Sequence, residues 1–298
     1  MFHDGAWRCY FGRMTTVVTG ATGHVGRLVV EQLVRAGERV RAMTRNPDTA
    51  RFPDGVEVVR GDLQQPRTLT AALADADRLY LFPVPQTARD VVKAAREAGI
   101  RRVVVLSSGA VTSGYDTTFH LPVEQAVEES GLEWTHVRPG EFALNALHMW
   151  GPSIRADRAV LDPYPGQVGC PVHEADIADV VVTALLTDGH VGTAHTVVGP
   201  QQISHREQVH AIADAIGHAI TIREVTAEQA LAHYRAQGGW AAANAEFLLG
   251  FQTYDGAAPS ADEPPAAVSL PTSQPVTGRP ARTFADWARD HVGDFVPN

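Results

Sequence analysis

The chain has 298 residues, of which 44% are hydrophobic and 20% charged, and its formal net charge is -9. This length suits one large domain, or a core domain with a smaller lobe. The negative charge argues against a nucleic-acid partner, because an acidic surface repels a phosphate backbone. The two cysteines, Cys9 and Cys170, lack the spacing of a disulfide framework or a zinc site.

No stretch approaches the roughly 20 apolar residues that a membrane-spanning helix requires, so we expect no membrane association. Residues 1–13 lack the apolar core of a secretory signal, and we interpret them as an N-terminal extension before Met14. The 13 histidines show no metal-ligand spacing, so we predict no metal site. The low cysteine content is compatible with a reducing compartment, and we expect a cytoplasmic protein.

Short β-branched runs alternate with longer amphipathic stretches from Met14 to about Pro139. The runs predict strands over Thr15–Thr19, Val40–Thr44, Val56–Val59, Leu79–Phe82, Val103–Leu106 and Trp134–Val137. The stretches between them predict helices over Val25–Ala36, Thr87–Ala98 and Pro122–Ser130. Alternating strands and helices form right-handed βαβ units, so we expect an α/β fold with a Rossmann-type doubly wound parallel sheet.

The pattern beyond Arg138 is less regular. We expect helices over Asp176–Leu186, His205–Ile216, Ala227–Gln237 and Arg282–His291. Residues 255–280 are rich in Ala, Pro and Ser and predict a long flexible loop. We therefore predict a nucleotide-binding core over 14–139, to which 172–187 returns, and a smaller C-terminal substrate lobe over most of 140–298.

Three glycines, Gly20, Gly23 and Gly26, stand between a predicted strand and a predicted helix, which is the setting of a dinucleotide-binding loop. The first permits a tight turn, the second lets the backbone approach a pyrophosphate, and the third lets the helix pack on the strand. The N–H groups and the dipole at the start of the helix attract phosphate. A tight turn without a ligand is the alternative interpretation.

The end of the second predicted strand indicates which dinucleotide is bound. An acidic residue there would accept hydrogen bonds from the ribose 2′-hydroxyl of NAD, but this chain has Arg45. A guanidinium can pair with a 2′-phosphate, so Arg45 favours NADP(H), whereas a solvated surface arginine is the alternative. Asp62, after the third predicted strand, either accepts from the adenine amino group or caps the turn that follows it.

These segments, with Ser130–Phe142, Asp176–Val180 and Gly278–Phe284, resemble the NmrA-like branch of the atypical short-chain dehydrogenase/reductases. The resemblance extends from Met14 to about Gly217 and implies a Rossmann core, a small C-terminal lobe and a nicotinamide site between them. It implies cofactor contacts at Gly20, Thr22, Gly23, His24, Val25, Arg45, Asp62, Leu63 and Phe82. Ser107 and Ser108, at the end of the fifth predicted strand, would lie beside the nicotinamide.

The chain departs from the pattern of typical short-chain dehydrogenases at one place. Those enzymes use a Tyr-x-x-x-Lys pair, in which the lysine lowers the pKa of the tyrosine that protonates a carbonyl. The corresponding helix here carries His120 and Glu124, an arrangement similar to that of bacterial NADPH:quinone oxidoreductases of the branch. We treat both as candidate catalytic residues, with His120 donating a proton or orienting the substrate. Alternatively, both are ordinary residues of a helix start.

The sequence favours an NADPH-dependent oxidoreductase that reduces a quinone-like or conjugated carbonyl small molecule. Such acceptors delocalise the developing charge and need less help from a protein acid. The alternatives are a non-catalytic NADP-binding redox sensor and a biosynthetic tailoring enzyme of the same fold. The family position favours the substrate cleft for Phe142, Asn145 and Trp150, whereas an aromatic cluster of this kind is more often part of a core. The resemblance implies a monomer or homodimer.

Overall fold

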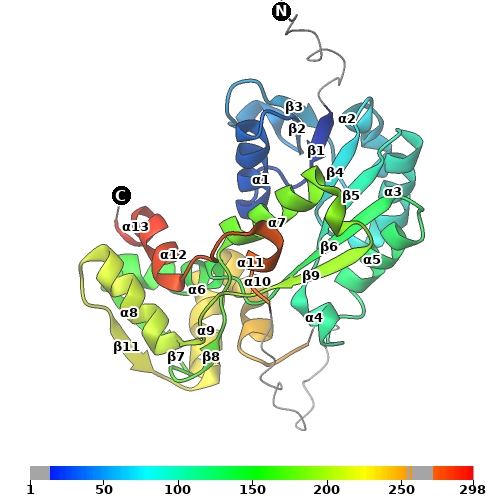
Figure 1. Cartoon of the computed structure of the whole chain (residues 1–298). Helices are drawn as coiled ribbons and strands as arrows, with labels where there is room; N and C mark the ends of the chain where they lie inside the picture. The colour runs from blue at the N-terminus through cyan, green and yellow to red at the C-terminus, as the bar shows by residue number, and fades with distance from the viewer. Residues whose placement is uncertain (1–13, 254–255, 257–270, 298) are drawn as a thin grey trace, which may run out of the picture.

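The computed structural model describes residues 14–253, 256 and 271–297, and its core is a sheet of seven parallel strands (Figure 1). The strands lie in the order β3-β2-β1-β4-β5-β6-β9. Their bounds are Thr15–Val18 for β1, Arg39–Thr44 for β2, Glu57–Arg60 for β3, Arg78–Leu81 for β4, Arg102–Leu106 for β5, Glu133–Pro139 for β6 and Thr193–Val197 for β9. The predicted Rossmann-type fold is confirmed.

The first three strands lie on one side of the sheet and the later strands on the other, so the strand order switches between β1 and β4. From β1 the strand order runs through β2 to β3 on one side, and from β4 through β5 and β6 to β9 on the other. Thr19 ties the two central strands together at their carboxyl ends, because its hydroxyl donates to the Tyr80 carbonyl at 2.9 Å and accepts from the Phe82 amide at 2.7 Å. In open parallel sheets, ligands bind outside this switch point.

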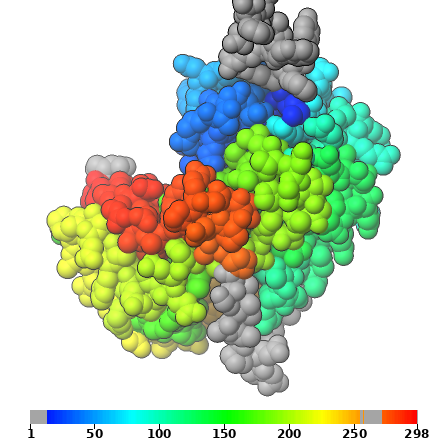
Figure 2. All heavy atoms as spheres, viewed as in Figure 1, coloured from blue at the N-terminus to red at the C-terminus, as the bar shows by residue number. Residues whose placement is uncertain are grey.

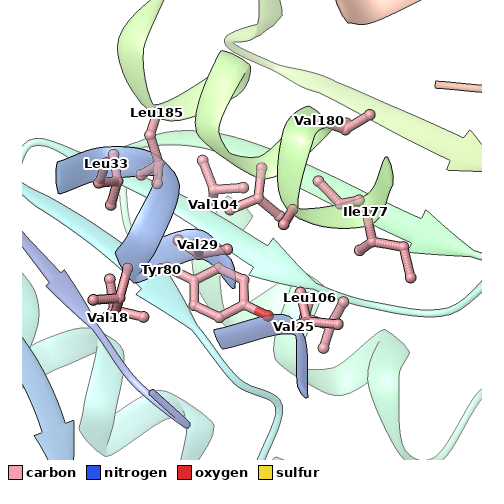
Figure 3. Close-up of a cluster of buried hydrophobic side chains, with 14 of the residues drawn as sticks. Val18, Val25, Val29, Leu33, Tyr80, Val104, Leu106, Ile177, Val180 and Leu185 are labelled. Atoms are coloured by element: carbon pink, nitrogen blue, oxygen red, sulfur yellow. The ribbon is translucent and has the colours of Figure 1, made fainter. Parts of the chain in front are cut away.

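Helices cover both faces of the sheet. Helices α1 (His24–Arg35) and α7 (Glu174–Leu186) pack against each other over one face, and α3 (Ala88–Glu97) and α5 (His120–Glu128) lie over the other (Figure 1). Figure 3 shows the first layer, in which Val29, Tyr80 and Ile177 meet from α1, β4 and α7. Burying an aliphatic side chain such as Val29 or Ile177 contributes about 1.5–3 kcal/mol to the stability of the fold. This layer therefore holds α1, and the glycine loop before it, in place.

A smaller lobe with its own hydrophobic core follows β6. Its helices are α6 (Leu144–Asp157), α8 (His205–Ile216), α9 (Ala227–Gln237), α10 (Gly239–Leu248), α12 (Phe284–Asp290) and α13 (Val292–Phe295). Strand β7 (Ala159–Asp162) pairs with β11 (Thr221–Glu224), and β8 (Val168–Gly169) pairs with β10 (Ile203–Ser204). Trp150, Tyr234 and Trp287 are among the large buried side chains of this lobe.

Several elements were not predicted from the sequence, among them β9, α6 and α10. Strand β9 is an edge strand whose residues are mostly half-buried, so it needs no continuous apolar run. Helix α6 contains Gly151 and Pro152, which are usually helix breakers, and α10 begins directly after Gly238. Burial in the lobe outweighs these local preferences, because Ile154 and Ala241 lie in its core.

The predicted loop over 255–280 lies largely outside the described residues, as do residues 1–13. The described part corrects this prediction, because Gln274–Thr277 form the short helix α11, which packs on α7. Figure 2 shows this orange segment between α7 and the red terminal helices. Arg282 anchors the chain there through ion pairs with Asp176 and Asp179 of α7.

The remaining helices are short. They are α2 (Thr70–Leu73), between β3 and β4, and α4 (Gly109–Thr112), directly after β5. Among the described residues, no helix combines the length and apolarity that crossing a membrane would require.

Candidate functional site

The glycine loop has the close geometry that its spacing predicts. Gly20 has a φ of +57°, which favours glycine, and its carbonyl accepts from the Gly23 amide at 2.9 Å. A Cβ on Gly26 would lie 2.2 Å from the Gly20 carbonyl oxygen, so only glycine lets α1 begin this close to the loop. The first turn of α1 contains no acidic residue and no side-chain cap, which leaves it suited to a phosphate.

A groove of about 330 Å³ opens at the carboxyl ends of β1 to β4. Its lining includes seven of the residues predicted to contact the cofactor: Gly20, Thr22, Gly23, Arg45, Asp62, Leu63 and Phe82. The other lining residues are Met43, Thr44, Gly61, Gln64 and Val84. Phe82 presents an exposed aromatic ring beside Gly20, and His24, Val25 and Gly26 form the first turn of the adjoining helix. The groove therefore lies at the switch point of the sheet.

Two arginines gather at the outer end of this groove. Arg45 is exposed and lines the groove, and its carbonyl accepts from Nη1 of Arg60, the last residue of β3, at 2.8 Å. Arg60 was not predicted from the sequence, although a second basic residue at the end of a predicted strand could have indicated it. Asp62 caps its own turn, because its carboxylate accepts from the Gln64 amide at 3.0 Å and the Gln65 side chain at 3.2 Å.

The end of β5 lies against the end of β6. Ser107 is buried and its amide donates to the Val137 carbonyl at 2.7 Å, and the hydroxyl of Ser108 accepts from the Ala110 amide at 3.2 Å. A Cβ on Gly109 would lie 3.1 Å from the Pro139 carbonyl oxygen. Both serines are therefore at the carboxyl edge of the sheet, where the resemblance puts the nicotinamide.

His120 begins α5 and is held by a residue that sequence reasoning missed. The carboxylate of Asp116, which is fully buried, accepts from the amides of Phe119 and His120 and contacts His120 Nδ1 at 2.5 Å. Burial lowers the pKa of His120, and Asp116 opposes this shift only in part. The contact with Asp116 fixes the orientation of the His120 ring at the start of α5.

Glu124 lies one turn further along α5 and is paired with β6. Arg138 donates from Nε to Glu124 Oε1 at 2.9 Å and from Nη2 to Oε2 at 2.6 Å. Burial raises the pKa of Glu124, but the hydrogen bonds from Arg138 and the charge of His136 outweigh it, so this pKa lies below its usual range. The predicted His120–Glu124 pair therefore consists of two side chains that each have a protein partner.

Glu124, Glu128 and His136 form a grouping that the sequence did not predict. Their ligand-type atoms all lie within 4.8 Å of one another, and His136 Nε2 contacts Glu128 Oε1 at 3.1 Å. The guanidinium of Arg138 already supplies a positive charge to Glu124, the buried carboxylate of the three. The grouping is thus a charge network between α5 and β6.

The three predicted substrate residues occupy different environments. Phe142 and Asn145 are half-buried where the chain enters the lobe, and Phe142 forms a bridge with Val172. Trp150 is only 3% exposed and packs edge-on against His205, with ring centroids 5.5 Å apart. The structure places Trp150 in the core of the lobe, because the inward face of α6 carries it there.

Two other aromatic side chains of the lobe approach the glycine loop. His148 of α6 contacts the ring of His24 edge-on, with centroids 5.4 Å apart, and stacks on Trp240 of α10 at 4.6 Å. His148 and Trp240 also line a second cavity of about 360 Å³ between α6, α10 and α13. Trp240 was missed, since nothing in the sequence links it to a histidine 92 positions earlier.

Comparison with known proteins gives a consistent picture. The NAD(P)H-binding family matches residues 20–188. The chain is 37% identical over 290 residues to the (4-alkanoyl-5-oxo-2,5-dihydrofuran-3-yl)methyl phosphate reductase of Streptomyces griseus, covering 94% of this chain and 99% of that protein. It is 33% identical over 299 residues to an NAD(P)H azoreductase of Xenophilus azovorans, covering 94% and 98%.

Solved structures resemble the whole described fold. Triphenylmethane reductase from Citrobacter sp., complexed with NADP(H), has a TM-score of 0.74 at 21% identity and covers 94% of this chain and 99% of its own. The NADPH-dependent quinone oxidoreductase of Escherichia coli, complexed with NADPH, has a TM-score of 0.70 at 20% identity and covers 93% and 99%.

Proposed function

This NAD(P)H-dependent oxidoreductase belongs to the NAD(P)H-binding family, in the NmrA-like branch of the atypical short-chain dehydrogenase/reductases, and we propose that it uses NADPH to reduce a quinone-like or conjugated carbonyl small molecule. One observation carries the proposal. The groove that Arg45 lines lies at the switch point of the sheet, where open parallel sheets bind their ligands.

The residues of the groove fit a dinucleotide that carries a 2′-phosphate. The glycine loop and the first turn of α1 offer N–H groups to a pyrophosphate, and no acidic side chain in that turn opposes it. Arg45 and Arg60 supply positive charge at the end of the groove, where the 2′-phosphate would lie. Bound NADPH would supply the hydride for the reduction.

Two observations support a conjugated acceptor: the missing tyrosine–lysine pair and the names of two relatives. No tyrosine–lysine pair is present at the start of α5 to protonate a simple ketone. A conjugated acceptor spreads the developing negative charge over several atoms, so positioning contributes more than acid catalysis. The name of the Streptomyces relative describes a reductase of an oxo-dihydrofuran, and an Escherichia coli relative is named quinone oxidoreductase 2. Both names support this class for the present chain.

His120 orients the acceptor in this proposal. Asp116 contacts the ring of His120 and so fixes its orientation at the start of α5. Asp116 contacts His120, and Arg138 pairs with Glu124. These contacts favour the alternative function, a redox sensor that binds NADP without turning it over.

A titration followed by an acceptor panel tests the proposal. Purified protein is titrated with NADPH and with NADH, and oxidation of the reduced cofactor is then followed with menadione, 2-cyclohexenone and an azo dye. Preferential binding of NADPH and oxidation accelerated by a conjugated acceptor support the reductase. Tight binding with no acceptor-dependent oxidation supports the sensor, and binding of neither dinucleotide contradicts both.

A further inference from the structure

We propose that His148 of the lobe joins His24 of the core in binding the pyrophosphate of the dinucleotide, so that the cofactor bridges core and lobe. The inference rests on the cofactor of the proposed function and is independent of which acceptor is reduced. The glycine loop predicts a pyrophosphate at the first turn of α1. The structure brings a side chain of α6 to this turn.

His24 lies at the phosphate-binding end of α1, which points toward the lobe (Figure 1). It is the first residue of the helix and follows Gly23, which has no side chain to cap the free N–H groups of the first turn. Side chains of a helix lean toward its N-terminus, so the exposed ring of His24 lies at the same end as these N–H groups. A phosphate bound there would lie beside this ring.

Three helices of the lobe position His148 at the same place. Its ring lies edge-on to the ring of His24, with centroids 5.4 Å apart and an interplanar angle of 69°. Trp240 of α10 stacks on His148, with centroids 4.6 Å apart and an interplanar angle of 28°. Gln237 of α9 donates from Nε2 to the His148 carbonyl at 2.8 Å. His148 is therefore held beside the start of α1.

The half-buried ring of His148 has room for a ligand. It lines the cavity of about 360 Å³ between α6, α10 and α13, together with Trp240 and the charged residues Arg155 and Asp294. Arg155 Nη1 already donates to the Asp294 carbonyl at 2.5 Å. In the part of the chain that the structure describes, the ring nitrogens of His148 have no hydrogen-bond partner. They can therefore donate to an anion next to His24.

Cofactor binding at this place should be linked to proton uptake. Burial lowers the pKa of His148, and the charge of His24 lowers it further. A pyrophosphate beside the two rings adds negative charge and favours the protonated, donating form of His148. The bound state therefore holds more protons than the free state, and affinity should fall as the pH rises through the range in which histidine titrates.

His148→Phe tests the proposal, because phenylalanine keeps a ring that stacks on Trp240 and loses both nitrogens. In calorimetric titrations at pH 6 with NADP⁺, which has the same pyrophosphate as NADPH, we expect the Kd to rise about tenfold, the effect of one hydrogen bond to a charged group. 2′-AMP carries the 2′-phosphate but no pyrophosphate, so it should bind both proteins equally. The matched control is His218→Phe, at an exposed histidine after α8 that lines neither cavity.

Titrations in two buffers with different ionisation enthalpies measure the protons taken up on binding. We expect the wild type to take up more protons than His148→Phe between pH 6 and pH 8, and the ratio of their Kd values to shrink as the pH rises. Equal Kd values for NADP⁺ at pH 6, or an equal loss of affinity for 2′-AMP, overturn the inference. A wild type that binds NADP⁺ but oxidises NADPH with no acceptor contradicts the proposed reductase only, since the Kd comparison still decides the role of His148.

Discussion

Arg138 of β6 and Glu124 of α5 form a two-point ion pair, with N···O distances of 2.9 and 2.6 Å. The Glu124 side chain is 1% exposed and that of Arg138 19%, so both charges are largely removed from water. In the predicted correspondence with typical short-chain dehydrogenases, Glu124 stands where those enzymes carry their lysine. In this chain the ion pair therefore joins α5 to the sheet.

Replacing one member of this pair should destabilise the fold. Glu124→Ala leaves a largely buried guanidinium without its partner, for which a loss of about 3–5 kcal/mol is expected in the free energy of unfolding by urea. The double variant Glu124→Leu with Arg138→Met removes both charges and should recover most of that loss. A loss below about 1 kcal/mol for Glu124→Ala would show that the pair is as weak as a surface ion pair.

The same pair predicts how stability depends on pH. The pKa of Glu124 is lowered in the folded state, so its contribution is fully present above the unfolded-state pKa and is lost as pH falls through the folded-state pKa. The difference in unfolding free energy between wild type and Glu124→Gln should therefore shrink as the pH is lowered through the acidic range. A difference that grows on acidification would contradict the depressed pKa.

Gly26 should not tolerate a side chain. The Cβ of Gly26→Ala would lie 2.2 Å from the Gly20 carbonyl oxygen, so α1 would have to move away from the loop. We expect NADPH affinity to fall by at least about tenfold, equal to about 1.4 kcal/mol, when measured by calorimetric titration. Gly189→Ala is the control, because its Cβ would meet nothing within 4 Å. Equal affinities for the two variants would argue against pyrophosphate binding at this loop.

Arg45 should determine the preference for NADPH. Arg45→Ala removes a charged hydrogen-bond donor worth about 1.5–3 kcal/mol, so the Kd for NADPH should rise about 10- to 100-fold and the Kd for NADH should change little. Arg51→Ala serves as control, because within the described residues this arginine donates to the carbonyls of Asp48 and Ala50 and does not line the groove. If Arg45→Ala weakens both cofactors equally, Arg45 does not recognise the 2′-phosphate.

The sequence predicted those parts of the fold and site that depend on residues close together along the chain. The glycine loop, the order of strand and helix around it, and Arg45 at the end of β2 are local features, so spacing alone revealed the groove. Edge strand β9 was missed because edge position relaxes the need for apolar residues. Helix α6 was missed because Gly151 and Pro152 suggested a break that packing overrides.

The partners of the candidate residues could not be predicted in the same way. Glu124 meets Arg138 only because α5 packs beside β6, and Arg45 meets Arg60 only because β2 pairs with β3. Trp150 was expected in the cleft, but the rotation of α6 turns it into the core of the lobe. Such contacts depend on how elements pack, which periodicity does not encode.

Transfer of deuterium tests the central claim most directly. NADPH labelled with deuterium at the nicotinamide C4, in each of its two stereochemical forms, is incubated with the protein and 2-cyclohexenone or menadione, and the recovered products are analysed by mass spectrometry and NMR. The account predicts that one of the two forms loses its deuterium, which appears at the β-carbon of cyclohexanone, and that NADH is a poorer donor. Failure of both forms to deliver deuterium, with NADPH bound but not consumed, would contradict it and leave a protein that binds the cofactor without using it.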